Sequence, residues 1–373
     1  MRRQTCQTSI TAIAFAGCKV EPVPPWSELA LANKAFPHRF PHRARTSLHR
    51  ALRFSSSDDN DYTMKRLAAF QETVTDGALS SVGRVEFHLN ADATLNKWVY
   101  SQEMMEVMSV IKSKIPKALE NCRLRGDSGE ELLPKTFEAN GLFRANFWKF
   151  IAPHVRVLGL SDLYSMPSTL LACPVLRELR MSFVALEDEM FLPTTGTAKL
   201  KSLVCIESWA AVCSSLGRIL DISDLEVLVI EPDRQILELD DPAEYQDAVK
   251  QIINHCKGSL KTLSLFYGYI DGSDQFISHE INLSEHVNLE LLSFMIPEGW
   301  EKGDENGNPQ DPEWHNPLLQ DVDKILKTIV SKDVVHNLVI RLENEKVELT
   351  CHGISEFSSR SFNFIQEDPS EEN

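Results

Sequence analysis

The sequence lacks the cysteine patterns that indicate a disulfide framework or a zinc site. Its eight cysteines are scattered, none forms a CxxC pair, and 373 residues are enough to bury a core without covalent cross-links. Several cysteines stand on apolar patterns, where a free thiol behaves as a small hydrophobic side chain. We therefore expect a reducing compartment, either the cytoplasm or the nucleus.

Motifs for catalysis and cofactor binding are also missing. There is no GxGxxG or GxxxxGK phosphate loop, no GxSxG nucleophile turn and no HExxH metal pair. His38 and His42 are four residues apart on a segment interrupted by proline, and the acidic run 304–308 lacks the residue order of an EF-hand. We expect no enzyme, no cofactor and no metal, with an unrecognised α/β enzyme as the remote alternative.

Long apolar runs are absent, and outside the N-terminus acidic residues outnumber basic ones. The stretch 10–17 is far shorter than the roughly 20 apolar residues of a membrane span, so no membrane partner is expected. The formal net charge is -16, although the first 57 residues are basic. Because phosphates require clustered cations, this balance disfavours nucleic acid and is compatible with a basic protein partner.

The two ends differ in composition from the middle. We expect residues 1–60 to form a disordered, basic and proline-rich tail, residues 61–354 a folded domain, and residues 355–373 a disordered acidic tail. The arginine-rich, acid-poor character of the first 57 residues also resembles a mitochondrial transit peptide, which makes the mitochondrion an alternative location.

Between the ends, the motif apolar-x-x-apolar-x-apolar recurs nine times. It begins at Val82, Leu119, Val155, Leu176, Leu200, Leu225, Leu260, Leu289 and Val335. The last two apolar residues lie two apart and therefore face one side of a strand, which stacking in parallel would bury. Helical periodicity predicts helical returns between the strands, in residues 102–117, 243–255 and 318–329.

The expected fold class is therefore α/β: an irregular leucine-rich-repeat-like solenoid of parallel strands with helical or irregular returns. The intervals of 24 and 25 residues after Leu176 and Leu200 fall within the 20–29 residues of natural repeats. The repeat consensus also asks for Asn or Cys three residues after the third apolar position, and Asn90 alone satisfies it. A mixed α/β domain without a repeat remains the alternative.

The residues between the buried motif positions would face the concave side of such a solenoid and bind a protein partner. Our candidates are Arg180, Ser182, Val204, Ile206, Val227, Val229, Phe266 and Met295. The apolar members would form a strip across neighbouring strands, and a contiguous exposed apolar patch usually marks an interface. Arg123, Arg125 and Arg180 would flank it as polar selectors. The alternative is that another segment, such as residues 301–317, folds over the strip.

With these residues in view, the stretch from Ser81 to Glu348 resembles the repeat half of fungal F-box/leucine-rich-repeat proteins. The phrases that carry the resemblance are HVRVLGLSDL from His154, CPVLRELRMS from Cys173 and GSLKTLSLFYG from Gly258. The resemblance implies a non-catalytic substrate receptor of an SCF-type ubiquitin ligase, with a protein partner and a link to the ligase adaptor.

The N-terminus departs from that family. An F-box opens near Leu-Pro and continues in short apolar helices, whereas here Pro24-Pro25-Trp26 is followed by the helix-breaking Pro37 and Pro41. The sequence contains no recognisable F-box, so no residue is assigned to adaptor binding. A free-standing repeat scaffold or regulator with no ubiquitin link is the corresponding alternative.

Overall fold

The computed structural model describes about half of the chain and divides it into two compact units. It describes residues 14–15, 18–22, 50–55, 65, 67, 82–89, 98–99, 101–126, 146–187, 197–231, 242–266, 281–296, 315–329, 337–342 and 348–351. Unit 1 comprises Met1–Ile222 and unit 2 comprises Ser223–Asn373. No helix among the described residues is long and apolar enough to cross a membrane.

Unit 1 is built on a sheet with the strand order β1-β2-β3-β4-β5-β6-β7-β9. Its strands are β1 (Ala14–Phe15), β2 (Cys18–Pro22), β3 (Arg50–Ser55), β4 (Arg84–His88), β5 (Asn121–Arg125), β6 (Val157–Pro167), β7 (Glu178–Glu187) and β9 (Ser202–Ile206). All neighbours from β3 to β9 are parallel, whereas β1 and β3 each pair with β2 in antiparallel fashion. A separate parallel pair joins β8 (Ala198–Lys199) to β10 (Leu220–Asp221).

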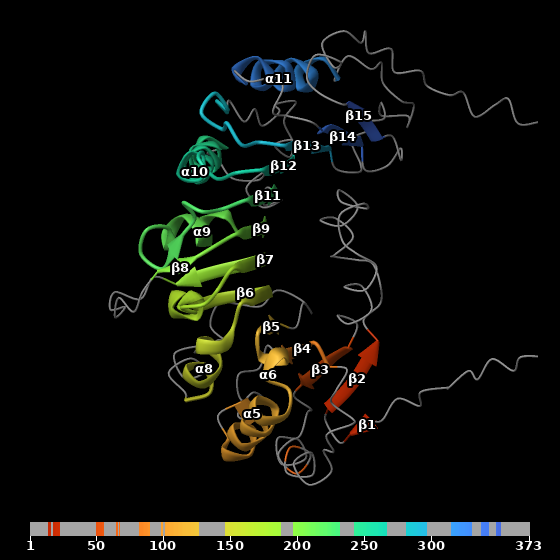
Figure 1. Ribbon diagram of the computed structural model, residues 1–373, viewed down its shortest axis with the longest axis vertical. Coiled ribbons are helices and arrows are strands. Elements are labelled where there is room, and N and C mark those ends of the chain that lie inside the picture. The colour runs from red at the N-terminus through yellow and green to blue at the C-terminus, as the bar shows by residue number, and fades with distance from the viewer. Residues whose placement is uncertain are drawn as a thin grey trace, which may run out of the picture. The chain divides into compact units, whose positions relative to one another are not determined.

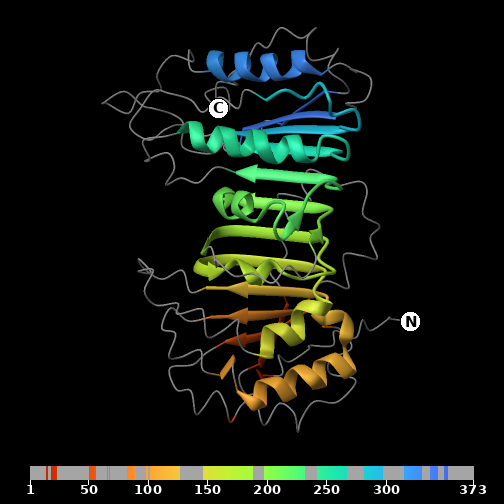
Figure 2. The same cartoon turned by 90° about the vertical axis from the view of Figure 1, so that its left-hand side faces the viewer.

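The helical segments of unit 1 connect these strands. They are α5 (Gln102–Lys114), α6 (Pro116–Leu119), α8 (Asn146–Ile151), α9 (Trp209–Ser215) and the short 3-10 helices η2 (Ala152–His154) and η3 (Ser168–Leu171). Helices α5, α8 and α9 lie on one side of the strands (Figures 1 and 2).

Unit 2 repeats the same plan with fewer strands. Its sheet runs β11-β12-β13-β14-β15, and the pairs from β11 to β14 are parallel while β14 and β15 are antiparallel. The strands are β11 (Val227–Glu231), β12 (Thr262–Phe266), β13 (Leu291–Ile296), β14 (Asn337–Leu342) and β15 (Glu348–Cys351). Its helices are α10 (Pro242–His255) and α11 (His315–Thr328).

The parallel strands and helical connections confirm the expected α/β class. Each of the nine predicted motifs coincides with a strand, and the strands of each unit follow one another in chain order. In β9, for example, Leu203 and Cys205 are fully buried, whereas the alternating Ser202, Val204 and Ile206 are half-buried. In β5, β9 and β11 the two-residue period of the motif thus separates a buried face from a more exposed one.

The predicted helical returns are confirmed, with one break. Residues 102–117 form α5 and the start of α6, because Pro116 cannot continue the first helix. Ser101 caps α5, its hydroxyl accepting a hydrogen bond of 3.1 Å from the backbone N–H of Met104. Met108 and Ile111 on the inner face of this helix are completely buried.

In both units, the residue after the first apolar motif position accepts two backbone hydrogen bonds through its carbonyl group. The carbonyl of Arg177 accepts hydrogen bonds from the N–H groups of Lys201 and Ser202 at 2.7 and 3.1 Å. In unit 2 the carbonyl of Glu226 accepts hydrogen bonds from the N–H groups of Lys261 and Thr262 at 2.9 and 3.0 Å. This forked bond joins the start of one strand to the next.

A buried serine connects the turn after β9 to a neighbouring strand. Ser208 stands three residues after Cys205, the third apolar position of its motif. Its buried hydroxyl accepts a hydrogen bond from the Val184 N–H at 2.9 Å and donates one to the Ile206 carbonyl at 2.8 Å. The hydroxyl therefore connects the turn after β9 to β7.

The structure differs from the sequence prediction in residues 1–60, where no regular structure was expected. Strands β1, β2 and β3 lie there, and β3 runs parallel to β4. Leu52 and Phe54 are both buried, and the Phe54 ring stacks on Phe87 of β4 at 5.6 Å between centroids. The short alternation Leu52-x-Phe54 is a strand signal that the surrounding arginines and prolines obscured.

Candidate functional site on the open face of unit 1

The sheet of unit 1 has a second face, opposite the buried motif residues, which we call the open face. Parallel pairing aligns one residue from each strand into a row across it, which we call the charged row. The row consists of Arg53, Glu86, Arg123, Gly159, Arg180 and Val204. All occupy the position between the last two apolar residues of a motif-like pattern, so the motif itself places them side by side.

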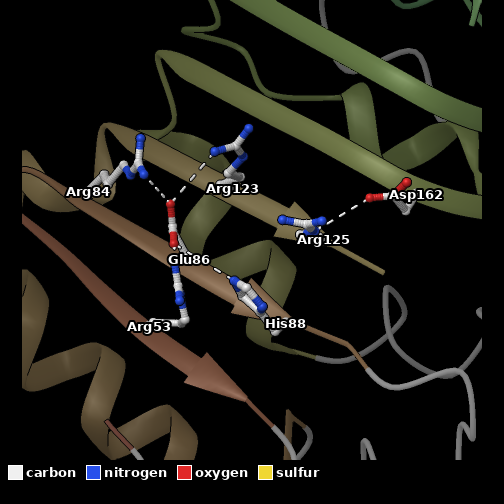
Figure 3. A network of polar contacts seen from close by, with 7 residues as sticks. All are labelled: Arg53, Arg84, Glu86, His88, Arg123, Arg125 and Asp162. Atoms are coloured by element: carbon white, nitrogen blue, oxygen red, sulfur yellow. Dashed lines mark hydrogen bonds and ion pairs between the residues drawn. The ribbon is translucent and has the colours of Figure 1, made fainter. Parts of the chain in front are cut away.

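Glu86 on β4 belongs to the charged row and is the centre of a cluster of ion pairs (Figure 3). Its side chain is only 2% exposed. Arg84 Nη2 lies 2.5 Å from Glu86 Oε1, and Arg53 Nε donates a hydrogen bond to Oε2 at 3.1 Å. Arg123 Nη1 and His88 Nε2 lie further away, at 3.9 and 3.8 Å. A buried carboxylate is thus surrounded by three guanidinium groups, the arrangement that a buried charge requires.

The electrostatics of this cluster keep Glu86 ionised. Burial alone would raise the pKa of Glu86, but His88 and the positive charges of Arg84 and Arg53 outweigh it and lower the pKa to about 2. Burial lowers the pKa of Arg123, and the neighbouring Arg125 and Arg180 lower it further. The carboxylate of Asp162 acts in the opposite direction and raises the pKa of Arg123.

A second ion pair joins the end of β5 to the middle of β6. Arg125 Nε is 3.5 Å from Asp162 Oδ2, and burial raises the pKa of Asp162 more than Arg125 and Arg123 lower it. Asp162 has a left-handed backbone with φ of 56°. Its carbonyl lies against Gly126, where a Cβ would be only 1.9 Å from the oxygen. Glycine is required at 126 because the chain leaving β5 approaches the backbone in the middle of β6 this closely.

Arg123 and Arg180 stand on either side of a position without a side chain. Between them in the charged row is Gly159, and a Cβ there would be 3.3 Å from Arg123 Cγ. Arg180 Nη2 is 4.0 Å from Glu178 Oε2, beyond hydrogen-bond length. Arg180 Nε is buried and makes no hydrogen bond within the part of the chain that the structure describes.

Four of the predicted partner-binding residues come together in unit 1. Arg180 pairs in register with Val204, and Ser182 pairs with Ile206, so a charged, a hydroxyl and two apolar side chains share one small area. All four are half-buried on the open face. Arg123 and Arg125, the expected flanking selectors, lie on the same face two strands away.

The other four predicted residues belong to unit 2. Val227 and Val229 are half-buried on β11, and Phe266 pairs in register with Met295, whose side chain, like that of Phe266, lies outside the described residues. Thr262, Ser264 and Ser293, on the face that the prediction places in the partner-binding strip, are buried. The segment 301–317, the predicted alternative cover, lies outside the described residues up to 314.

Sequence reasoning missed the anionic centre of the open face. Glu86 was recognisable as the residue between Val85 and Phe87 of the first motif, but nothing in the local pattern distinguishes a buried carboxylate from a solvated one. Arg53 was missed because β3 was missed. The signal available for both was the alternation of charged and apolar residues in Leu52-Arg53-Phe54 and Val85-Glu86-Phe87.

Neither metal-ligand nor thiol chemistry is favoured by the described side chains. No group of three or more His, Cys, Asp or Glu among them is placed to hold a metal ion. Burial raises the pKa of Cys173 and of Cys256 to about 12, so these thiols are poor nucleophiles at neutral pH. Comparisons with family models, with curated proteins and with solved structures each found no match to this chain.

Proposed function

We propose that this chain is a non-catalytic protein-interaction module whose binding surface includes the open face of unit 1. The observation that carries the proposal is the adjacency, in register, of Arg180 with Val204 and of Ser182 with Ile206. Arginine beside partly exposed apolar side chains is the composition enriched in protein interfaces. The face consists of side chains on strands, which hold their positions more precisely than loops do.

The architecture we propose is an irregular leucine-rich-repeat solenoid. Parallel strands in chain order, the forked backbone bond at Arg177 and Glu226, and the Ser208 hydroxyl at the turn support it. In such a fold each repeat buries its apolar face only against its neighbours and presents the opposite side to a partner.

For the biological role, the resemblance to F-box/leucine-rich-repeat proteins favours substrate recognition for an SCF-type ubiquitin ligase. A free-standing scaffold or regulator with no ubiquitin link is the competing role. The two roles differ in one partner, since only the first requires capture of the ubiquitin-ligase adaptor.

The test is quantitative affinity capture of the full chain from cells, followed by mass spectrometry. We compare the unchanged chain with Val204→Glu, and we use Val287→Glu as the matched control because Val287 is 59% exposed in unit 2. The proposal expects specific partners to be lost with Val204→Glu and retained with Val287→Glu, both variants remaining folded by circular dichroism. Equal capture by the three proteins would contradict it.

The same data separate the two roles. Recovery of the ligase adaptor together with a cullin would support the ubiquitin-ligase role. Reproducible partners that depend on Val204, recovered without the adaptor, would support the scaffold.

A further inference from the structure

Three neighbouring strands of unit 1, β6, β7 and β9, share an unusual backbone conformation directly after their motifs. Asp162, Phe183 and Glu207 have positive φ angles of 56°, 55° and 48°. Each stands two residues after the third apolar position of its motif, and the register of β6 with β7 sets Asp162 opposite Phe183. We call these three residues the left-handed row. Such a backbone suits glycine, is tolerated by Asn and Asp, and is strained for a bulky side chain.

Phe183 is the least suitable of the three residues for this backbone. Alternation along β7 would turn its side chain to the buried face, but after the left-handed residue it is Val184 that is buried. Phe183 is 37% exposed, and among the described residues it is the aromatic member of the exposed large apolar side chains. The residue at 183 is thus unfavourable for the backbone and only partly used by the core.

A buried hydrogen bond holds the chain in this conformation. The Ser208 hydroxyl accepts the N–H of Val184, the residue after Phe183, at 2.9 Å, and it donates to the Ile206 carbonyl at 2.8 Å. Ser208 is 3% exposed, so water does not compete for the bond. The turn after β9 therefore fixes the backbone on which Phe183 is presented, next to Ser182 of the open face.

The two carboxylates of the left-handed row are already engaged within the chain. Asp162 Oδ2 lies 3.5 Å from Arg125 Nε. Glu207 is 7% exposed and interacts with another group of the chain. What the row offers to a partner is therefore the uncharged ring of Phe183. Half-buried Ile206, the register partner of Ser182, adds apolar surface beside it.

We propose that Phe183 is a contact residue of the partner-binding surface, that it receives an apolar side chain of the partner protein, and that Ser208 is its positioning residue. The inference rests on the protein-binding function proposed above and names the chemistry of one contact. An aromatic ring supplies a large apolar area at a small cost in conformational entropy, and such anchors carry much of the binding energy of interfaces. A strained backbone that the surrounding structure enforces is typical of such sites.

The binding experiment selects a random peptide library, displayed on phage, against the full chain and against Phe183→Ala. We expect the unchanged chain to enrich peptides with a fixed apolar residue and Phe183→Ala to lose that enrichment. A selected peptide is then synthesised and its affinity measured by fluorescence anisotropy. Phe183→Ala should weaken it by about tenfold or more, as truncation of an interface aromatic does. The affinity should change little with ionic strength, because an apolar contact is not screened by salt.

The matched control is Val175→Ala, which truncates an apolar side chain of nearly the same exposure, 38%, in the turn before β7. It should leave the affinity unchanged. Ser208→Ala tests the positioning residue, because it keeps the ring but removes the hydrogen bond to Val184. It should weaken the peptide several-fold, and Ser208→Thr, which keeps the hydroxyl, should recover part of the loss.

A second measurement separates the strained backbone from the packing of the ring. Phe183→Gly and Phe183→Ala both remove the ring and differ in backbone freedom. Since residue 183 is left-handed, the glycine variant should have the higher urea midpoint, which reverses the ordinary order within a strand. Ala185→Gly is the control at a residue without a positive φ, and it should lower the midpoint. Both variants at 183 should lose the peptide equally.

Four results would overturn the inference. The first is selection of peptides defined by acidic or basic residues, and the second is the absence of any enrichment by the unchanged chain. The third is equal affinity of the selected peptide for the unchanged chain and for Phe183→Ala. The fourth is a Phe183→Ala variant at least as stable as Phe183→Gly.

Failure here is distinguishable from failure of the proposed function. If partners captured from cells are lost with Val204→Glu but retained with Phe183→Ala, the protein-binding function stands and the role assigned to Phe183 is wrong.

Discussion

The two units place different residues on the same scaffold position. Between the last two apolar residues of each motif, unit 1 has Glu86, Arg123, Gly159, Arg180 and Val204, whereas unit 2 has Val229, Ser264, Ser293 and Val339. Register aligns each set into a row. The motif therefore determines that such a row forms, but it does not determine which residue types the row contains.

Burial of the row differs between the units as well. In unit 1, Arg123 and Arg180 have side chains 28% and 35% exposed, whereas Ser264 and Ser293 in unit 2 are 6% and 4% exposed. The small hydroxyl residues of unit 2 suit a packed environment, and long arginines suit one that meets solvent or a partner. The apolar motif alone thus does not decide how exposed the row is, because the intervening residues differ between the units.

The largest expected difference between the units concerns Glu86. Glu86→Ala leaves Arg84 and Arg53 without their buried carboxylate, which should lower the free energy of unfolding by about 3 kcal/mol or more. Ser264→Ala changes the same position of the row in unit 2 and should cost about 1 kcal/mol or less. Urea unfolding at pH 7 measures both, and equal losses would show that the charged row has no special structural role.

A second comparison uses one glycine from each unit. Gly126→Ala would bring a Cβ to 1.9 Å from the Asp162 carbonyl oxygen, so β6 must shift, at a cost of about 2 kcal/mol. A Cβ at Gly258 meets nothing within 4 Å, and Gly258→Ala should therefore be close to neutral. Thermal unfolding of the two variants provides the measurement; a neutral Gly126→Ala would contradict the close approach of Gly126 to the backbone of β6.

A smaller effect is expected at Ser208. Ser208→Ala leaves the Val184 N–H without its acceptor in a buried position and should cost about 1–2 kcal/mol. The control is Ser109→Ala in α5, whose exposed hydroxyl bonds to the Met105 carbonyl of the same helix. Its urea midpoint should remain near that of the unchanged chain, while that of Ser208→Ala decreases.

The smallest expected effect is a difference between the units in how the free energy of unfolding depends on pH. Burial lowers the pKa of His286 below 6.5, although its hydrogen bond to the Ile253 carbonyl opposes this. Since the unfolded chain takes up a proton first, stability attributable to His286 is lost as pH falls below about 6.5. Glu86, with a pKa of about 2, contributes stability that is lost only as pH falls from about 4.5 towards 2.

Urea midpoints at pH 7.0, 5.5 and 3.5 test this order. Replacing His286 with Gln should reduce the change between pH 7.0 and 5.5, and replacing Glu86 with Gln should reduce the change between 5.5 and 3.5. A His286→Gln variant with the original dependence above pH 5.5 would contradict the first assignment.

Much of the fold followed from local pattern, and the exceptions have physical causes. The positions of β4 to β7 and of α10 were predictable because period-2 and period-3.6 alternation are properties of neighbouring residues. Strand β3 was not, because its short apolar alternation acquires meaning only beside β4, where Phe54 stacks on Phe87. Arg180 and Val204 were identifiable as face residues, but the buried ion cluster at Glu86 was not.

The sequence by itself determined where the strands of the nine motifs are and which residues stand between their apolar positions, because side chains alternate along any strand. The tertiary structure alone decided that Arg53, Glu86, Arg123 and Arg180 lie in one row, since they are separated along the chain and only strand register aligns them. It also decided their electrostatics. Whether a carboxylate is buried among guanidinium groups depends on neighbours contributed by other strands, and no local pattern records those neighbours.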